Sequence, residues 1–194
     1  MKKMILVTSP PACGKTYISR QLAARMKHIV YLDKDLLIPL SNRVFIAAGQ
    51  TIDRSSDFFK QNIRDYEYQA IVGIGLEALK FDDIVLINAP FTKEVHSTPA
   101  LQALRDSLKQ LNASLTVIWV VTTPEICHQR MIARNSDRDT WKLSHWDEYI
   151  KTVDFSIPAP LARLEAGKDL LLFYNSSDEE FARSMREVLP KLEQ

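Results

Sequence analysis

The segment from Ser9 to Thr16 has residue types at a spacing that could hold a chain of phosphates. It reads Ser-Pro-Pro-Ala-Cys-Gly-Lys-Thr and lies between a short apolar run and a helical pattern. Gly14 would let the backbone approach an anion closely at the start of the helix, whose dipole favours negative charge. The ammonium of Lys15 would then act on the β- and γ-phosphates of ATP, and the hydroxyl of Thr16 would bind Mg²⁺. The expected nucleotide-binding residues are Pro11, Ala12, Cys13, Gly14, Lys15, Thr16 and Tyr17.

This segment departs from the usual pattern G-x-x-x-x-G-K-[ST] at its beginning. Ser9 stands where the first glycine is expected, and Pro10 and Pro11 remove two backbone N–H donors. The alternative interpretation is a strand-to-helix turn with an incidental Gly-Lys-Thr. The thiol of Cys13 also has two interpretations, because the helix end could lower its pKa or the residue could be a passive part of the loop.

Two carboxylates follow the second apolar run, in the sequence Asp33-Lys34-Asp35. Ligands bind at the carboxyl edge of open parallel sheets, and alternate residues of an extended chain point to the same side. Phosphoryl transfer to an alcohol needs a carboxylate that accepts the hydroxyl proton and another near the metal. We expect Asp35 to be the base and Asp33 the metal-side partner, although the two roles could be exchanged. The alternative is a solvated turn or a helix cap.

The third apolar run ends at Asn88, where many nucleotide-binding enzymes carry an aspartate. An amide can accept a hydrogen bond from a metal-bound water but brings no charge. A metal-side carboxylate is therefore expected from Asp33. Asn88 could also be a plain strand-end residue.

Three arginines recur at every fourth position after the fourth apolar run: Arg130, Arg134 and Arg138. Guanidinium groups on a mobile segment could stabilise the negative charge of a phosphoryl-transfer transition state. A solvated helix face is the alternative. Aromatic and imidazole side chains follow at Trp141, His145 and Trp146. They could stack on an acceptor ring or pack within the segment.

Short apolar runs alternate with helical patterns, which is typical of a parallel sheet covered on both faces. The expected strands are Met4–Thr8, Ile29–Asp33, Ile84–Asn88, Leu115–Val121 and Leu170–Tyr174. Helices are expected over Lys15–Met26, over Ser56–Lys80, after the N-cap Thr123, and from a capping box at Ser177 to a stop before Pro190. In the second helix the expected apolar stripe is Phe59, Ile63, Tyr66, Ala70 and Ile74.

The composition is that of one ordinary globular domain over residues 1–194, with 46% hydrophobic and 25% charged residues. A formal net charge of +1 gives no global attraction for a polyanion, so a nucleic-acid partner is possible but not favoured. The two cysteines fit no disulfide framework and no metal-ligand spacing. With no signal-peptide pattern and no run long enough to span a bilayer, we expect a cytoplasmic protein without membrane contact. The oligomeric state stays open.

The loop, the Asp-x-Asp after the second strand and the later arginines together resemble the small P-loop kinases. This AAA-type ATP-binding group includes shikimate kinase, chloramphenicol phosphotransferase, zeta toxin and the kinase domain of polynucleotide kinase. The resemblance covers nearly the whole chain in order of elements. It implies an α/β fold, the P-loop NTPase three-layer sandwich, with a five-stranded parallel sheet in the order 2-3-1-4-5, helices on both faces and a helical lid. It also implies an acceptor-binding cap at about residues 36–70 and a lid at about residues 134–155.

The resemblance assigns further roles to single residues. It places Asp35 on the acceptor hydroxyl and Asp33 beside magnesium. Arg64 would hold the acceptor, unless Arg64 and Glu67 are an exposed ion pair on the helix. Arg130 would lie near the adenine, Arg134 and Arg138 would reach the phosphates, and the backbone of Asn175 and Ser176 would border the adenine.

The activity that the resemblance implies is transfer of the γ-phosphate of Mg-ATP to a hydroxyl of a small-molecule or nucleotide-like acceptor. A polynucleotide 5′-hydroxyl kinase is one alternative. A nucleotide-dependent switch without phosphotransfer is another, and in it Asp35 would be dispensable.

Overall fold

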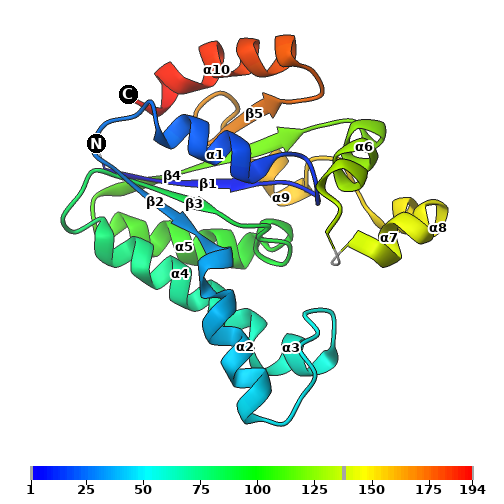
Figure 1. The fold of residues 1–194 in the computed structure, drawn as a ribbon. Coiled ribbons are helices and arrows are strands. Elements are labelled where there is room, and N and C mark those ends of the chain that lie inside the picture. Colours follow the sequence, from blue (N-terminus) through cyan, green and yellow to red (C-terminus); the bar gives the residue numbers. More distant parts are fainter. Residues whose placement is uncertain (1, 137–138, 194) are drawn as a thin grey trace.

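A computed structural model describes residues 2–136 and 139–193, which form a parallel sheet between two layers of helices (Figure 1). The strands are β1 (Lys2–Thr8), β2 (Ile29–Asp33), β3 (Ile84–Asn88), β4 (Ala113–Val121) and β5 (Leu170–Tyr174). Their order in the sheet is β2-β3-β1-β4-β5, and all pairs are parallel. The expected fold class and strand order are confirmed.

The sheet is buried on both faces because its strands are apolar at successive positions. Met4 and Leu6 of β1 face one core, which α4 (Arg64–Ala78) and α5 (Thr98–Lys109) cover. Ile5 and Val7 face the other, under α1 (Lys15–Ala23) and α10 (Asp178–Leu192). Figure 1 shows these helix pairs on opposite faces of the sheet. The carboxyl ends of the strands stay uncovered by these layers, and the loops gather there.

Two groups of short helices lie outside the layers. The first follows β2 and comprises the 3₁₀ turn η1 (Lys34–Leu37), α2 (Ile38–Ala47) and α3 (Asp57–Asn62). Figure 1 shows α2 and α3 extending away from the sheet. The second follows β4 and comprises α6 (Pro124–Arg134), α7 (Thr140–Ser144) and α8 (Trp146–Thr152). A 3₁₀ turn η2 (Glu94–His96) and a short α9 (Ala159–Ala162) complete the described elements.

The single helix expected over Ser56–Lys80 is wrong, because the chain breaks at Ile63 into α3 and α4. Ile63 has φ −129°, outside the helical region, and its side chain is buried. It packs with Phe45 and Phe59 in a small core separate from the sheet. This tertiary contact overrides the helical periodicity of the sequence.

The apolar stripe expected along this helix is also wrong in α4. Tyr66 and Ile74 are exposed, whereas Tyr68, Ile71 and Gly75 face the sheet. A Cβ atom at Gly75 would lie 3.0 Å from Met4 Cε and 3.1 Å from Ile87 Cδ1. The glycine therefore lets α4 approach the strands closely, and Arg64 and Glu67 are buried residues of the same helix.

The last helix continues past the expected stop before Pro190 and ends at Leu192. Val188 and Leu192 are buried against the sheet, so the final turn keeps its place although Pro190 donates no hydrogen bond. The ammonium of Lys3 donates to the carbonyls of Lys191 (3.2 Å) and Leu192 (3.1 Å), which satisfies two acceptors at the helix end.

The expected helix caps after β4 and β5 are present. Thr123 Oγ1 accepts a hydrogen bond from Ile126 N at 3.4 Å, and Ser177 Oγ accepts one from Glu180 N at 3.2 Å. Within residues 2–136 and 139–193, no helix has the length and apolar character needed to cross a membrane.

Candidate active site

The loop between β1 and α1 has two residues in the left-handed region of backbone conformation. Ala12 has φ 63° and Gly14 has φ 94°, the latter at the N-cap of α1. A Cβ atom at Gly14 would lie 2.4 Å from Asn175 Nδ2, so any larger residue would displace the loop or the asparagine. Gly14 is required here both for its backbone conformation and for this close approach.

The ammonium of Lys15 lies over the beginning of the same loop. It donates to the Ser9 carbonyl (3.1 Å), to Ser9 Oγ (3.1 Å) and to the Pro10 carbonyl (3.0 Å). Ser9, which replaces the usual glycine, therefore supplies a side-chain acceptor for the lysine. Burial lowers the pKa of Lys15 to about 8, while the negative charge of Asp35 acts in the opposite direction. A desolvated ammonium of this kind favours the approach of an anion.

The backbone carbonyl of Cys13 holds the loop against the ends of β4 and β5. It accepts hydrogen bonds from Thr122 Oγ1 (3.1 Å), Arg130 Nη1 (3.2 Å) and Asn175 Nδ2 (2.8 Å). Arg130 also donates through Nη2 to the Asn175 carbonyl at 2.7 Å. Thr122 and the side chain of Asn175 could not be predicted from the sequence, because neither stands in a motif that indicates a loop contact.

Thr16, Asn88 and Asp33 meet at the carboxyl edge of the sheet. The register of β2 and β3 pairs Asp33 with Asn88, and Asn88 is the last residue of β3, the strand that lies between β2 and β1. Asn88 Nδ2 donates to Thr16 Oγ1 (3.0 Å) and to Asp33 Oδ2 (3.0 Å). Asn88 is thus more than a strand-end residue, because it joins the loop to the carboxylate.

This cluster fits a magnesium ion. Mg²⁺ prefers oxygen ligands, and the cluster offers a hydroxyl and a carboxylate as ligands and the Asn88 Oδ1 atom as an acceptor for a metal-bound water. That oxygen is buried and finds no hydrogen-bond partner among the described residues. No group of three or more His, Cys, Asp or Glu side chains that could hold a metal occurs in the described part of the chain. An ion here would take most of its ligands from phosphate and water.

The chain does not stay extended after Asp33, so the expectation that alternate residues point both carboxylates to one side does not apply. The chain turns into η1 after Asp33, whose Oδ1 accepts a hydrogen bond from Asp35 N at 3.0 Å. The Asp35 side chain is 52% exposed, and its Oδ1 lies 3.4 Å from Lys34 Nζ. Its charge still acts on the loop lysine Lys15. The carboxylate is therefore open to an incoming molecule beside the loop.

Arg64 is buried, and the expected alternative of an exposed Arg64–Glu67 pair is wrong. Its guanidinium donates to both carboxylate oxygens of Glu94 at 3.1 Å and to Asp65 Oδ1 at 2.7 Å. The group also lies 4.3 Å from the centre of the Tyr68 ring. An acceptor contact would have to share this guanidinium with Glu94.

Glu67 is buried, and its carboxylate binds polar and positively charged side chains of the segment that follows β2. Its carboxylate accepts from Lys34 Nζ (3.2 Å), from Arg54 Nη2 (2.6 Å to Oε2) and from the Ser41 hydroxyl. Hydrogen bonds from Arg54 and Ser41 and the charge of Lys34 outweigh burial and lower the pKa of Glu67. The glutamate ties η1, α2 and the loop before α3 to α4.

The polar and aromatic side chains of α6 and of the segment that follows it contact one another. Arg134 Nε donates to Asp139 at 2.9 Å, and Lys142 Nζ donates to the same buried carboxylate at 3.1 Å. Trp146 stacks on His128 with ring centres 4.0 Å apart. Trp141 stacks on His145 at 5.1 Å in the same way, with half of its surface exposed. Arg138 lies outside the described residues.

A cavity of about 530 Å³ opens between α1, α6 and the start of α10. Its lining includes Gly14, Tyr17, Arg130, Asn175 and Ser176, all named from the sequence as nucleotide neighbours. The Tyr17 ring lies beside the Phe181 ring, with centres 5.3 Å apart. The cavity has the size and the mixed lining that suit a nucleoside next to the loop.

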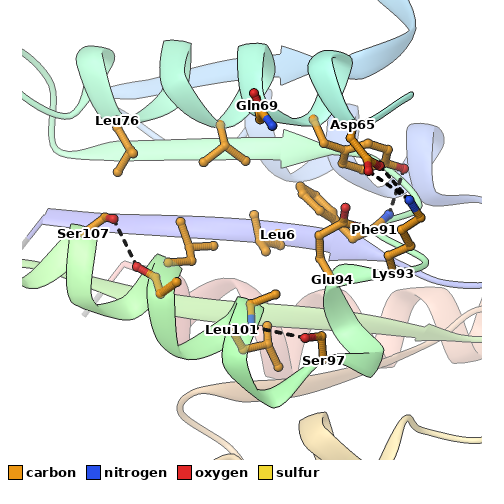
Figure 2. A pocket seen from close by; sticks show the side chains of 15 residues that line it. Leu6, Asp65, Gln69, Leu76, Phe91, Lys93, Glu94, Ser97, Leu101 and Ser107 are labelled. Carbon is orange, nitrogen blue, oxygen red and sulfur yellow. Dashed lines mark hydrogen bonds and ion pairs between the residues drawn. The ribbon is translucent and has the colours of Figure 1, made fainter. Parts of the chain in front are cut away.

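A second cavity, of about 460 Å³, lies between α4 and α5 (Figure 2). Leu6, Phe91 and Leu101 line its interior, and Figure 2 shows Lys93 and Asp65 paired at one end. Apolar walls suit phosphate poorly. The phosphate site is therefore expected at the loop after β1.

A parallel sheet in this strand order, with a Gly-Lys-Thr loop after its first strand, is the fold of the P-loop kinases. A family model described as "AAA domain" matches residues 4–155, and the chain belongs to this family. The search of curated proteins found no match.

Solved structures share the fold over nearly the whole chain. A gluconokinase from Sinorhizobium meliloti 1021 aligns with a TM-score of 0.56 at 14% identity, covering 98% of this chain and 90% of that one. Shikimate kinase from Bacteroides thetaiotaomicron aligns with a TM-score of 0.51 at 12% identity, covering 100% of this chain and 99% of that one. The PezAT chromosomal toxin–antitoxin system of Streptococcus pneumoniae aligns with a TM-score of 0.51 at 14% identity, covering 100% and 88%. At these identities the similarity shows the fold alone.

Proposed function

We propose that this protein is a kinase that transfers the γ-phosphate of Mg-ATP to a hydroxyl of a small-molecule or nucleotide-like acceptor. The observation that carries the proposal is the meeting of Lys15, Thr16, Asn88 and Asp33 at one edge of the sheet, where β1, β3 and β2 end. The names gluconokinase and shikimate kinase, given to two structures with this fold, fit a small acceptor.

The loop from Pro11 to Tyr17 binds the phosphates through the backbone amides of the residues after Pro11, with Gly14 at the point of closest approach. Lys15 moves its ammonium from the loop carbonyls to the β- and γ-phosphates. The nucleoside occupies the cavity of about 530 Å³ beside Tyr17 and Arg130. Arg130 also keeps the loop in place through the Cys13 carbonyl.

Thr16 and Asp33 would hold a magnesium ion, and Asn88 orients both of them through its amide. The ion, when bound, offsets negative charge on the β- and γ-phosphate oxygens.

Asp35 accepts the proton of the acceptor hydroxyl, since its exposed carboxylate stands beside the loop. The acceptor lies under a cap at about residues 36–70, with Arg64 as one of its contacts. A lid at about residues 134–155 brings Arg134 and Arg138 to the transferred group. Arg134 would have to leave Asp139, or bind it and the transferred group together, because its guanidinium donates to the Asp139 carboxylate.

The test is a screen for transfer of label from γ-labelled ATP to nucleosides, sugars, antibiotics and RNA 5′ ends. With an acceptor in hand, Asp35→Asn should lower the transfer rate by about 10²–10⁴-fold, because the general base is lost. The Kd for ATP should stay within about twofold, since Asp35 does not line the nucleotide cavity. Asp82→Asn serves as a matched control at the opposite end of β3. An unchanged transfer rate in Asp35→Asn would exclude this residue as the base.

A further inference from the structure

The two cysteines of the chain meet in the core beside the phosphate-binding loop. Cys13 belongs to the loop and Cys127 to the first turns of α6, 114 positions further along the chain, yet their Sγ atoms are 3.5 Å apart. Both are free thiols with 0% of their surface exposed. Sequence spacing gave no sign of this pair, because the fold alone brings α6 against the loop.

The surroundings of the two thiols are unequal. The hydrogen bond with Cys127, helped by the charge of Lys15, lowers the pKa of Cys13 to about 7 although burial acts in the opposite direction. The same contact and burial raise the pKa of Cys127. Cys13 is therefore the nucleophilic member of the pair, and Cys127 keeps its proton.

We propose that Cys13 and Cys127 form a redox-responsive modification site, in which a peroxide converts the two thiols to a disulfide and thereby weakens nucleotide binding. The regulatory half of this inference rests on the proposed function. The chemical half rests only on the position of the two sulfur atoms.

The reaction balances with hydrogen peroxide as the oxidant. The Cys13 thiolate attacks one peroxide oxygen, the O–O bond breaks, and the products are a Cys13 sulfenic acid and hydroxide, which takes a proton to become water. The Cys127 sulfur then attacks the sulfenic sulfur, the S–O bond breaks, and a second water leaves with the thiol proton. Two thiols lose two electrons and two protons in total, and the peroxide is reduced to two waters. A dithiol reductant reverses the disulfide by exchange.

The disulfide changes the loop because its bond is shorter than the present contact. A disulfide needs its sulfurs about 2.05 Å apart, so the two atoms must approach by about 1.5 Å. Thr122, Arg130 and Asn175 all bind the Cys13 carbonyl, and Arg130 lies on α6 one turn after Cys127. A shift of the loop or of α6 therefore disturbs these bonds together. The amides beside Gly14 then no longer match the phosphates.

The experiment uses the full chain, reduced or treated with a tenfold excess of hydrogen peroxide. Alkylation and peptide mapping should find a Cys13–Cys127 linked peptide, and non-reducing denaturing electrophoresis should show no covalent dimer. The Kd for a fluorescent ATP analogue should rise at least tenfold after oxidation and return to its first value with dithiothreitol. Cys127→Ala and Cys127→Val should bind the analogue like the reduced wild type, form no linked peptide, and leave a Cys13 sulfenic acid that dimedone traps.

Several results would overturn the inference. One is the absence of the linked peptide in the folded wild type, a measurement that needs no variant. Another is a linked peptide with a Kd changed by less than twofold. If the reduced wild type binds no ATP, the proposed function fails instead, and hydrogen exchange at residues 11–17 then decides the inference. Faster exchange on oxidation supports it, and unchanged exchange overturns it.

Discussion

Gly14 shows how one residue can determine the shape of a binding loop. Its left-handed φ of 94° and its contact with Asn175 both exclude a side chain. The neighbouring carbonyl of Cys13 meanwhile takes three donors, so the loop is held from one side and open on the other. Such pre-organisation lowers the entropy lost when a ligand binds.

Gly14→Ala should therefore weaken ATP binding by about 100-fold or more, since a displacement of about 1 Å in a binding site has effects of this size. Isothermal titration of both proteins measures the change. Gly73→Ala is the matched control, because a Cβ there would meet nothing within 4 Å in the described structure. Equal affinities of Gly14→Ala and wild type would contradict the assigned role of the loop.

Asn88→Ala tests the proposed magnesium site. The substitution removes the hydrogen bonds to Thr16 and Asp33, so the two oxygen ligands lose their common orientation. We expect the Mg²⁺ concentration for half-maximal activity to rise about 10–100-fold, as for other outer-shell partners of metals. Asn62→Ala, an exposed asparagine of α3, is the control and should leave this concentration unchanged. A normal Mg²⁺ dependence in Asn88→Ala would place the ion elsewhere.

Among the contacts between secondary-structure elements, the buried carboxylate of Glu67 joins α4 to the segment after β2. Its pKa is lowered in the folded state, because Arg54, Ser41 and Lys34 outweigh burial. A carboxyl with a lowered folded pKa contributes stability above its unfolded pKa, and that contribution is lost as the pH falls through the folded value.

The unfolding free energy of the wild type should thus decrease as the pH falls below the ordinary glutamate pKa of 4.5. Glu67→Gln should be less stable at neutral pH and show a flatter decrease, since a neutral amide does not titrate. Urea titrations at several pH values measure both effects. Glu77→Gln, an exposed residue of the same helix, should follow the wild-type curve. Parallel curves for Glu67→Gln and wild type would contradict the charge network.

The elements that were predicted well are those whose cause lies in neighbouring residues. The five strands and the caps at Thr123 and Ser177 follow from short apolar runs and local hydrogen bonds. The break at Ile63 and the buried face of α4 depend on distant partners, Phe45 in one case and Met4 in the other. No local pattern contains this information.

The same division applies to the candidate site. The loop and the position of Asp33 were predictable, because motif spacing places them at the carboxyl ends of two strands of the same parallel sheet. The link through Asn88, the support from Thr122 and the contact of Cys13 with Cys127 were not, since each depends on the register of separate strands and helices. The partners of Arg64 and Arg134 likewise became visible only in the structure.

Ligand binding should increase the unfolding free energy of the protein as a whole. A ligand that binds only the folded state at about 100 times its Kd adds about 2.7 kcal/mol to the unfolding free energy. For a chain of this size, that gain corresponds to an increase in Tm of about 5–10 °C. Differential scanning fluorimetry with Mg-ATP measures it, and Gly14→Ala should show an increase of at most about 2 °C at the same ATP concentration. A wild-type Tm that is the same with and without saturating ATP would contradict nucleotide binding.

The small aromatic core of Phe45, Phe59 and Ile63 is separate from the two cores of the sheet. Substitutions within this core should leave the two cores of the sheet intact, whereas Ser41 and Arg54 of the same segment are held to α4 through Glu67. In the proposed kinase this segment forms part of the acceptor cap. Grafting residues 36–62 onto another protein of this fold should then exchange one acceptor for another.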